Sequence, residues 1–314
     1  MKSSVFWGVL AATALAGLVL TEAVANEYYY NALYLILQGM LMAIAWNILG
    51  GFTGYVNFGS AGFFALGAYT TVALNKALGL PLPLLILCAG MVGGLVGLGL
   101  GYLTLRLKGV YFAIATLAMA IVIETFIANW SYVGGAKGSY MLTPEKFLWF
   151  DSYIQMLFMV MLLLTLAAVA VSRALNASRL GRGLAAIRDD EVAAECAGVP
   201  TLRLKLVSTT VMGAMMGIAG APFPFFVTYV EPVSAFSLFI AVNAIAMPMI
   251  GGTAHWIGPV IGALLLGGTQ EIVKVTISSE MNVLIVGIML VVFITLAPQG
   301  IVGLVRKHMR RRSK

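Results

Sequence analysis

One stretch of this sequence, residues 178–200, holds the densest group of charged side chains between the two ends of the chain. The acidic run at 189–191 suits the first turn of a short helix, and Gly198 followed by Pro200 would stop that helix. Small alanines between them would let another protein approach closely, and the neighbouring charges could pair across the contact. The stretch therefore predicts a short helix, which is either a docking helix or a solvated amphipathic helix in a loop. Its proposed contact residues are Arg188, Asp189, Asp190, Glu191, Ala193, Ala194, Glu195 and Gly198.

No other pattern in the sequence predicts catalysis, a metal site or a nucleotide site. Residues 134–139 carry a lysine and a serine among glycines, but not at the spacing of a phosphate-binding P-loop. His255 and His308 stand far apart, and neither Cys88 nor Cys196 has metal-ligand spacing. The two cysteines should lie at different depths, so we expect no disulfide between them. We predict no catalytic residue, no metal and no cofactor on this chain, and any ATP must be held by another chain.

The composition indicates that this helix belongs to a membrane protein. The chain has 314 residues, of which 61% are hydrophobic and 10% charged, and its mean hydropathy is +0.98. Soluble domains average roughly 45–50% apolar and about 25% charged residues. This composition excludes an ordinary soluble enzyme, a nucleic-acid-binding protein and a disordered protein. We therefore interpret the net charge of +7 as basic residues in cytoplasmic loops, not as a nucleic-acid surface.

A membrane-spanning helix needs about 20 mostly apolar residues. We predict an all-α, polytopic transmembrane helical bundle of about ten membrane segments, forming a single domain over residues 1–314. The segments 55–74 and 236–250 are the weakest, and either could be a half-helix, which would reduce the count to eight. The candidate segments are 5–21, 28–50, 55–74, 82–105, 110–130, 153–171, 206–227, 236–250, 256–274 and 283–305.

The N-terminus has two interpretations. Lys2 and the apolar run before Ala23-Val24-Ala25 resemble a signal peptide with its cleavage site. The length of the apolar run favours a retained helix instead.

Basic residues predict the orientation of the bundle. All but four of the 19 Lys and Arg residues fall on one side if both termini face the cytoplasm and the chain crosses at every segment. This topology places residues 172–205, the longest charged stretch, in a cytoplasmic loop, and residues 131–152 outside.

Polar residues inside apolar segments are the candidates for a solute pathway, because such residues are costly in a membrane and often functional. Each could equally make a hydrogen bond between helices, which is the more common role. The candidates are Asn57, Ser60, Thr116, Glu124 and Asn243.

Glycines also have two interpretations, close packing between helices or breaks beside a pathway. The spacing of Gly93, Gly97 and Gly101 favours a helix-contact face.

The docking helix resembles the coupling loop of ABC importer permeases, whose signature is Glu-Ala-Ala, three residues, then Gly. Ala193, Ala194 and Gly198 keep that spacing, but Val192 stands at the acidic position and Glu191 precedes it. That form resembles the branched-chain amino acid branch of the family. Stretches that resemble other parts of the M-type permease of Liv-type importers are 51–70, 108–118, 250–259 and 298–301.

The resemblance implies an ABC importer permease fold in the inner membrane of a bacterium. It further implies a second homologous permease subunit, two ATP-binding subunits that dock on the cytoplasmic loops, and a periplasmic solute-binding protein. The expected function is ATP-driven import of branched-chain amino acids or similar small solutes, with ATP hydrolysis on the partner chains and no enzyme activity here.

Three alternatives remain open at this stage. The same type of permease could carry urea, short amides or aromatic acids. The chain could work alone as a gradient-driven secondary transporter, or it could be a subunit needed only for assembly.

Overall fold

The computed structural model describes residues 3–23, 26–141, 152–276, 281–296 and 300–304, and nearly all of them are helical. The long helices are α1 (Ser3–Ala23), α2 (Glu27–Thr53), α3 (Ser60–Leu78), α4 (Leu82–Thr104), α5 (Val110–Asn129), α6 (Tyr153–Ala177), α9 (Thr201–Gly220), α12 (Leu238–Gly251), α13 (Gly258–Thr276) and α14 (Met281–Leu296). The short elements are η1 (Ser131–Val133), η2 (Gly135–Lys137), α7 (Arg179–Asp189), α8 (Glu191–Cys196), α10 (Phe223–Val227) and α11 (Pro232–Ala235). Two short strands, β1 (Ser139–Tyr140) and β2 (Tyr229–Val230), pair antiparallel, with Ser139 opposite Val230.

Seven helical spans among the described residues are long and apolar enough to cross a membrane. The prediction of an all-α polytopic protein is thus confirmed, whereas the expected count of about ten segments is not. Helices α3 and α13 also stand in the bundle, but polar residues such as Asn75 and Glu271 lower their hydropathy. The seven spans are Ser4–Glu22, Glu27–Thr53, Leu82–Thr104, Val110–Asn129, Tyr153–Ala177, Thr201–Val227 and Pro232–Gly251.

Helix α2 lies at the centre of the bundle, where it packs against α6, α9, α12 and α13. Every residue from Met40 to Thr53 is buried, including the large side chain of Trp46. This half of the helix is buried on all sides, as expected for the core of a membrane bundle. The peripheral helices instead expose apolar side chains. Leu95 on α4 is 69% exposed and Tyr111 on α5 is 74% exposed, which suits contact with lipid or another membrane subunit.

Helices α4 and α9 pack closely against each other through glycines. A Cβ atom added to Gly93 would lie 2.3 Å from the Gly213 carbonyl oxygen, and one added to Gly97 would lie 2.8 Å from that of Thr209. Only glycine allows the two backbones to approach this closely. The predicted helix-contact face of the α4 glycines is therefore confirmed.

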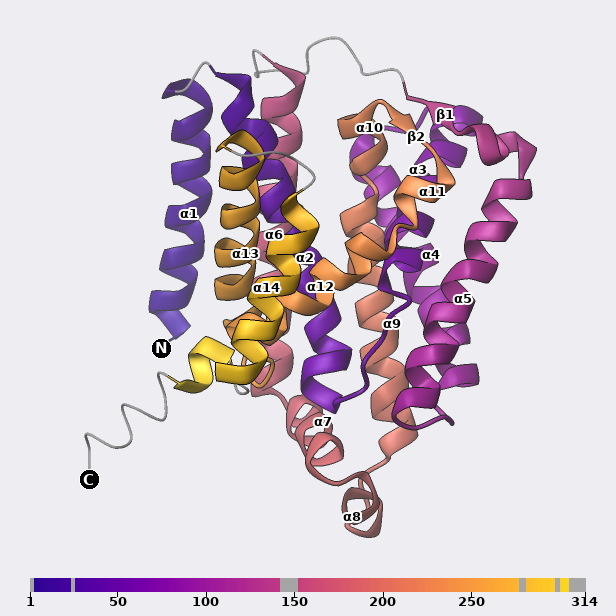
Figure 1. Ribbon diagram of the computed structural model, residues 1–314, viewed down its shortest axis with the longest axis vertical. Helices are drawn as coiled ribbons and strands as arrows, with labels where there is room; N and C mark the ends of the chain where they lie inside the picture. The colour runs from indigo at the N-terminus through magenta and orange to yellow at the C-terminus, as the bar shows by residue number, and fades with distance from the viewer. Residues whose placement is uncertain (1–2, 24–25, 142–151, 277–280, 297–299, 305–314) are drawn as a thin grey trace.

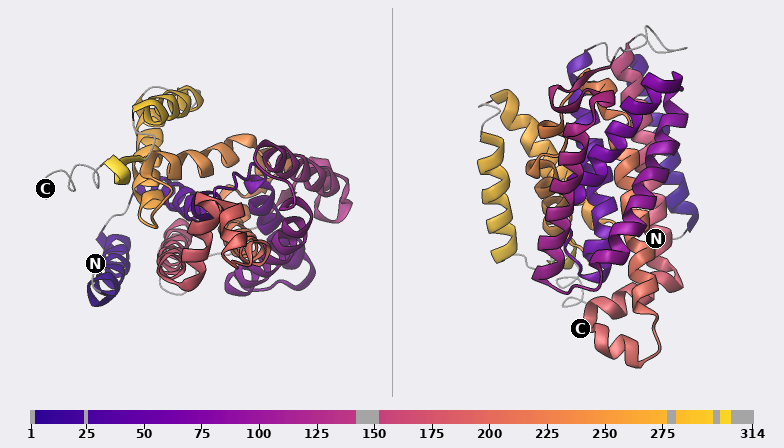
Figure 2. Two further views of the ribbon diagram at one scale, coloured as in Figure 1. Left: turned by 90° about the horizontal axis from the view of Figure 1, so that it is seen from below. Right: turned by 90° about the vertical axis from the view of Figure 1, so that its right-hand side faces the viewer.

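The two ends of the bundle differ in structure (Figure 1). Helices α7 and α8 project beyond the bundle at its lower end, where α1 begins and α14 ends. Figure 2 shows the same projection from the side. The opposite end carries the β1–β2 pair with η1, η2, α10 and α11. The predicted loop 131–152 lies at this end, although 142–151 are outside the described residues, as are the predicted cytoplasmic ends 1–2 and 305–314. The alternative cleavage site also extends beyond the described residues, at 24–25.

Candidate functional site

The projecting helix pair α7–α8 occupies the middle of the stretch 172–205. Residues 172–177 continue α6, and 201–205 begin α9. The acidic run does not form one first turn, because α7 ends at Asp189 and α8 begins at Glu191. Asp190 between them is extended, and its Oδ1 accepts hydrogen bonds from the backbone N–H groups of Val192 and Ala193 at 2.9 and 3.0 Å. Asp190 is thus the N-cap that starts α8.

The remaining predicted contact residues divide between an outer and an inner face of this pair. Asp189, Ala193, Glu195 and Gly198 are exposed, whereas Ala194 is only 5% exposed and packs against the chain itself. The two neighbouring alanines of the motif therefore have opposite roles, since only Ala193 is free to meet another protein.

Two further contacts fix the shape of the pair. Arg188 forms an ion pair with Asp189 at 3.3 Å. Glu195 Oε1 accepts a hydrogen bond from the Thr201 hydroxyl at 2.6 Å, which ties α8 to the start of α9. Cys196 is exposed at the end of α8, and both it and Cys88 are free thiols, as expected.

Glu191 faces inward and forms a cluster with Lys205 and Tyr55, called the anchor cluster below. Lys205 Nζ donates to Glu191 Oε1 at 2.6 Å, to Tyr55 Oη at 3.0 Å and to the Leu105 carbonyl at 3.3 Å. The Tyr55 hydroxyl in turn donates to Glu191 Oε2 at 2.7 Å. The Lys205 side chain is only 3% exposed, yet all three of its ammonium donors have an acceptor.

Electrostatics keep the anchor cluster charged. Burial alone would raise the pKa of the Glu191 carboxyl, but hydrogen bonds from Lys205 and Tyr55 and the nearby positive charges outweigh it. The pKa of Glu191 is therefore lowered from its ordinary value of 4.5. Lys108 contributes a second cation 3.8 Å from Glu191 Oε2, and its 61% exposure makes it the weaker partner. Glu191 is ionised at neutral pH, so the buried Lys205 has a permanent counter-charge.

Residues 54–59, between α2 and α3, are not helical, and Figure 1 shows this segment running back among the helices to the start of α3. The N–H and C=O groups of non-helical backbone inside a membrane protein need hydrogen-bond partners from the surrounding protein. The indole Nε1 of Trp46 donates to the Asn57 carbonyl at 2.8 Å, and Phe58 N donates to Thr116 Oγ1 at 3.2 Å. The segment is thus held by α2 on one side and α5 on the other.

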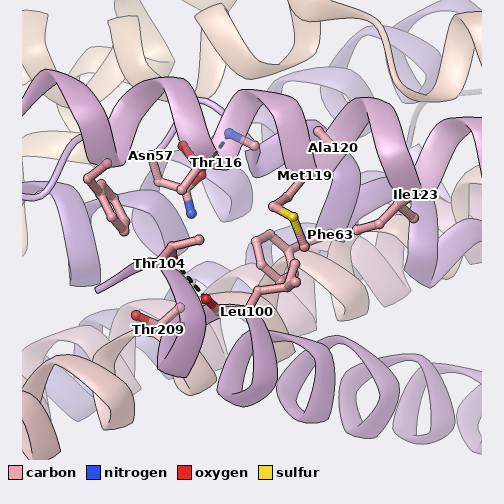
Figure 3. Close-up of a pocket in the computed structure, with 12 residues that line it drawn as sticks. Asn57, Phe63, Leu100, Thr104, Thr116, Met119, Ala120, Ile123 and Thr209 are labelled. Carbon is pink, nitrogen blue, oxygen red and sulfur yellow. Dashed lines mark hydrogen bonds between the residues drawn. The ribbon is translucent and has the colours of Figure 1, made fainter. Parts of the chain in front are cut away.

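Three of the predicted pathway residues meet at this segment. Asn57 and Thr116 line a small cavity, shown in Figure 3, and Ser60 is fully buried at the start of α3. Phe63 and Met119 also line the cavity, which has a volume of about 10 Å³, room for about one water molecule. It is too small to hold an amino acid.

The other two pathway candidates lie elsewhere. Asn243 on α12 accepts a hydrogen bond from Gln270 on α13 at 2.9 Å, which is the helix-to-helix role. Glu124 is half-buried on α5, one turn beyond Ala120 at the cavity wall.

A larger cavity of about 840 Å³ lies between α1, α2, α6 and α13. Its walls are mainly apolar, and it contains none of the predicted pathway residues. Arg173 stands at it with its guanidinium 3.8 Å from the centre of the Phe6 ring. Size alone does not make this cavity a solute site.

Sequence reasoning missed two members of the anchor cluster, Tyr55 and Lys205. A lysine at the start of an apolar helix was visible in the sequence, but its partner Tyr55 is 150 residues away. No local spacing rule connects them.

Comparisons with known proteins identify the family that this sequence matches. Residues 28–294 match the family model described as "Branched-chain amino acid transport system / permease component". The high-affinity branched-chain amino acid transport system permease protein LivM of Salmonella typhimurium is 27% identical over 299 residues, covering 87% of this chain and 70% of the relative. LivM of Escherichia coli K12 is 26% identical and covers 86% and 69%. A probable branched-chain amino acid transport permease, LivH of Methanocaldococcus jannaschii, is 25% identical and covers 90% and 92%.

Proposed function

The chain belongs to the family of permease components of branched-chain amino acid transport systems, and from that premise we propose that it is the M-type membrane subunit of an ATP-driven importer. Its cargo is a branched-chain amino acid or a similar small solute delivered by a periplasmic binding protein. The observation that carries this proposal is helix α8, which projects from the bundle with Ala193 exposed and Glu191 held inside.

The proposed complex contains a second homologous permease, two ATP-binding subunits and the solute-binding protein. ATP is bound and hydrolysed on the partner subunits, and this chain supplies a path and a docking surface. The outer face of α7–α8 suits an ATP-binding subunit because it combines the small residue Ala193 with the charges of Asp189 and Glu195.

The proposed orientation places α7, α8 and both termini in the cytoplasm of a bacterium, with the chain crossing the inner membrane several times. Basic residues near the projecting end support this orientation. The opposite end, with the β1–β2 pair, then faces the solute-binding protein.

Cys196 offers a direct test of the orientation because it is exposed on α8. In a Cys88→Ser background, a membrane-impermeant maleimide should label Cys196 in inside-out vesicles and not in intact right-side-out vesicles. Labelling only in right-side-out vesicles would reverse the proposed topology. A Cys88→Ser, Cys196→Ser variant controls for labelling at other groups.

The function itself is tested in two steps. Complexes purified from native membranes through a C-terminal tag should contain a second permease and ATP-binding subunits, and should hydrolyse ATP. Proteoliposomes of that complex with the binding protein should then take up leucine only with ATP. Uptake driven by an ion gradient without ATP-binding subunits would favour the secondary transporter, and uptake of urea or amides in place of leucine would change the cargo.

A further inference from the structure

We propose that the anchor cluster transmits movement of α8 to the 54–59 segment, so that Glu191 is a positioning residue inside the permease and not a contact for the ATP-binding subunit. The proposal rests on the proposed function, and it assigns one acidic residue of the coupling motif to the membrane side of the helix.

The cluster joins four parts of the chain. Glu191 belongs to α8, Lys205 to α9 and Tyr55 to the 54–59 segment, while the Leu105 carbonyl lies just after α4. The side chain of Glu191 is 14% exposed, whereas Asp189 on the neighbouring helix is 75% exposed. An ATP-binding subunit that docks from outside therefore meets Asp189 before it meets Glu191.

A buried, fully bonded ion pair is a stiff connection. Separating Lys205 from Glu191 would leave an uncompensated ammonium in a site that is 3% exposed, which is strongly unfavourable. A push on α8 will therefore displace the side chains of Lys205 and Tyr55 with it before it breaks the pair, while the backbone of α9 stays in place.

Tyr55 is well placed to pass that movement on. Its ring contacts the Phe112 ring on α5 edge to face, with centroids 5.1 Å apart. Two residues further on, Asn57 lines the small cavity of Figure 3. The backbone N–H of the next residue, Phe58, donates a hydrogen bond to the Thr116 hydroxyl on α5. Movement of Tyr55 therefore reaches the cavity wall through a few residues of extended chain.

Helix α7 lies beside Gly54, the first residue of the 54–59 segment. A Cβ atom added to Gly54 would lie 3.4 Å from Arg188 Cγ, so Arg188 lies beside Gly54 with room for about one methyl group between them. Arg188 on α7 thus lies beside Gly54, while Glu191 on α8 accepts a hydrogen bond from the next residue, Tyr55.

The test compares Glu191→Gln and Lys205→Met with Glu271→Gln as the matched control, since Glu271 is an equally shielded acid, 16% exposed, that is ion-paired to Lys274 on α13, away from the cluster. Each variant is purified as the whole complex and reconstituted, and uptake and ATP hydrolysis are measured on the same proteoliposomes. We expect the two cluster variants to retain their ATP-binding subunits and to hydrolyse ATP, while solute moved per ATP falls about tenfold. The control should keep the wild-type ratio.

Two further variants guard against misfolding. Tyr55→Phe removes only one hydroxyl, and we expect it to lower the ratio of uptake to hydrolysis by a few-fold. The charge reversal of Glu191→Lys with Lys205→Glu should recover part of the ratio lost in Lys205→Met, because the pair is restored while the bond to the Leu105 carbonyl is not.

Three results would overturn the proposal. Loss of ATP-binding subunits from the Glu191→Gln complex would make Glu191 a docking contact. An unchanged ratio in Tyr55→Phe and Glu191→Gln would show that the cluster transmits nothing. An equal fall of uptake and hydrolysis in all cluster variants, with no recovery on charge reversal, would leave only a structural role. Failure of the proposed function is distinguishable, because the wild-type chain would then purify without ATP-binding subunits.

Discussion

Two contacts in this bundle hold helices together in opposite ways. The α4–α9 contact is made by glycines that bring two backbones together, with Gly93 against Gly213. The contact of α8 with α9 and the 54–59 segment is made by the ion pair between Glu191 and the buried Lys205 and by the Tyr55 hydroxyl. Close packing has one good arrangement and resists sliding. A charged contact holds specific side chains together while the loops that carry them move. We infer that the α4–α9 contact is rigid, and we call it the frame. We infer that α8 moves together with the anchor cluster and the 54–59 segment, and we call this unit the joint.

The largest effect should come from breaking the frame. Gly93→Leu places a side chain where even a Cβ atom would lie 2.3 Å from the Gly213 carbonyl oxygen. We expect destabilisation of more than about 3 kcal/mol and little folded protein in the membrane. Thermal unfolding in detergent and the amount of protein in the membrane measure this. Gly99→Leu is the control, because nothing lies within 4 Å of a Cβ atom there, and equal losses in both variants would contradict the frame.

The next largest effect should come from blocking the outer face of the joint. Ala193→Arg puts a long cation on an exposed position, so folding should be unchanged while docking of an ATP-binding subunit is lost. We expect uptake to fall about 100-fold, since a small-residue contact cannot accept the added volume. Co-purification and uptake are the measurements, with Ala193→Ser as the control. Normal uptake in Ala193→Arg would remove α8 from the docking surface.

These two predictions differ in how far the sequence alone supports them. The glycine spacing on α4 and the spacing of Ala193 and Gly198 are local patterns, and local patterns survive in any fold that keeps the helix. The inward turn of Ala194 could not be predicted, because α8 has six residues and its facing is set by the capping of Asp190 and by the bundle. The Glu191–Tyr55 bond joins residues 136 apart, and only tertiary packing brings them together.

The pathway residues make the same point. Polar side chains in apolar helices were correctly identified as unusual, but their type does not say which way they face. Asn57 and Thr116 meet at the irregular segment, whereas Asn243 bonds across to α13. The predicted segments 28–50 and 55–74 place a helix break at 51–54, whereas the structure has it at 54–59. The shift could not be predicted, because hydrogen bonds from Trp46 on α2 and to Thr116 on α5 support the non-helical residues.

A smaller effect should follow from loosening the far end of the joint. Thr116→Val removes the acceptor for the Phe58 N–H, and leaving that donor buried costs about 1–3 kcal/mol. Because this loosens the 54–59 segment, we expect a lower unfolding temperature and uptake changed by a few-fold. Thr104→Val is the matched control in the same cavity, since its hydroxyl bonds only to the Leu100 carbonyl of its own helix. Equal effects in both variants would show that the segment does not depend on α5.

The smallest effect, and the one specific to the charged joint, is its response to acid. Glu191 has a lowered pKa in the folded protein, so its contribution is complete above its ordinary value of 4.5 and is lost as the pH falls through the lower folded value. The α4–α9 contact is made by glycines, which do not titrate, so its stability should not change with pH in this range.

A fluorophore on Cys196, in a Cys88→Ser background, reports the mobility of α8 directly because that thiol is exposed at the end of the helix. Glu191 stays ionised between pH 8 and pH 5, so we expect the anisotropy of the fluorophore to be constant there. It should fall only below about pH 4.5. Glu191→Gln should show low anisotropy at every pH, since its joint is already weakened. A transition between pH 5 and 8 in the wild type, or the same acid transition in Glu191→Gln, would mean that another group holds α8 in place.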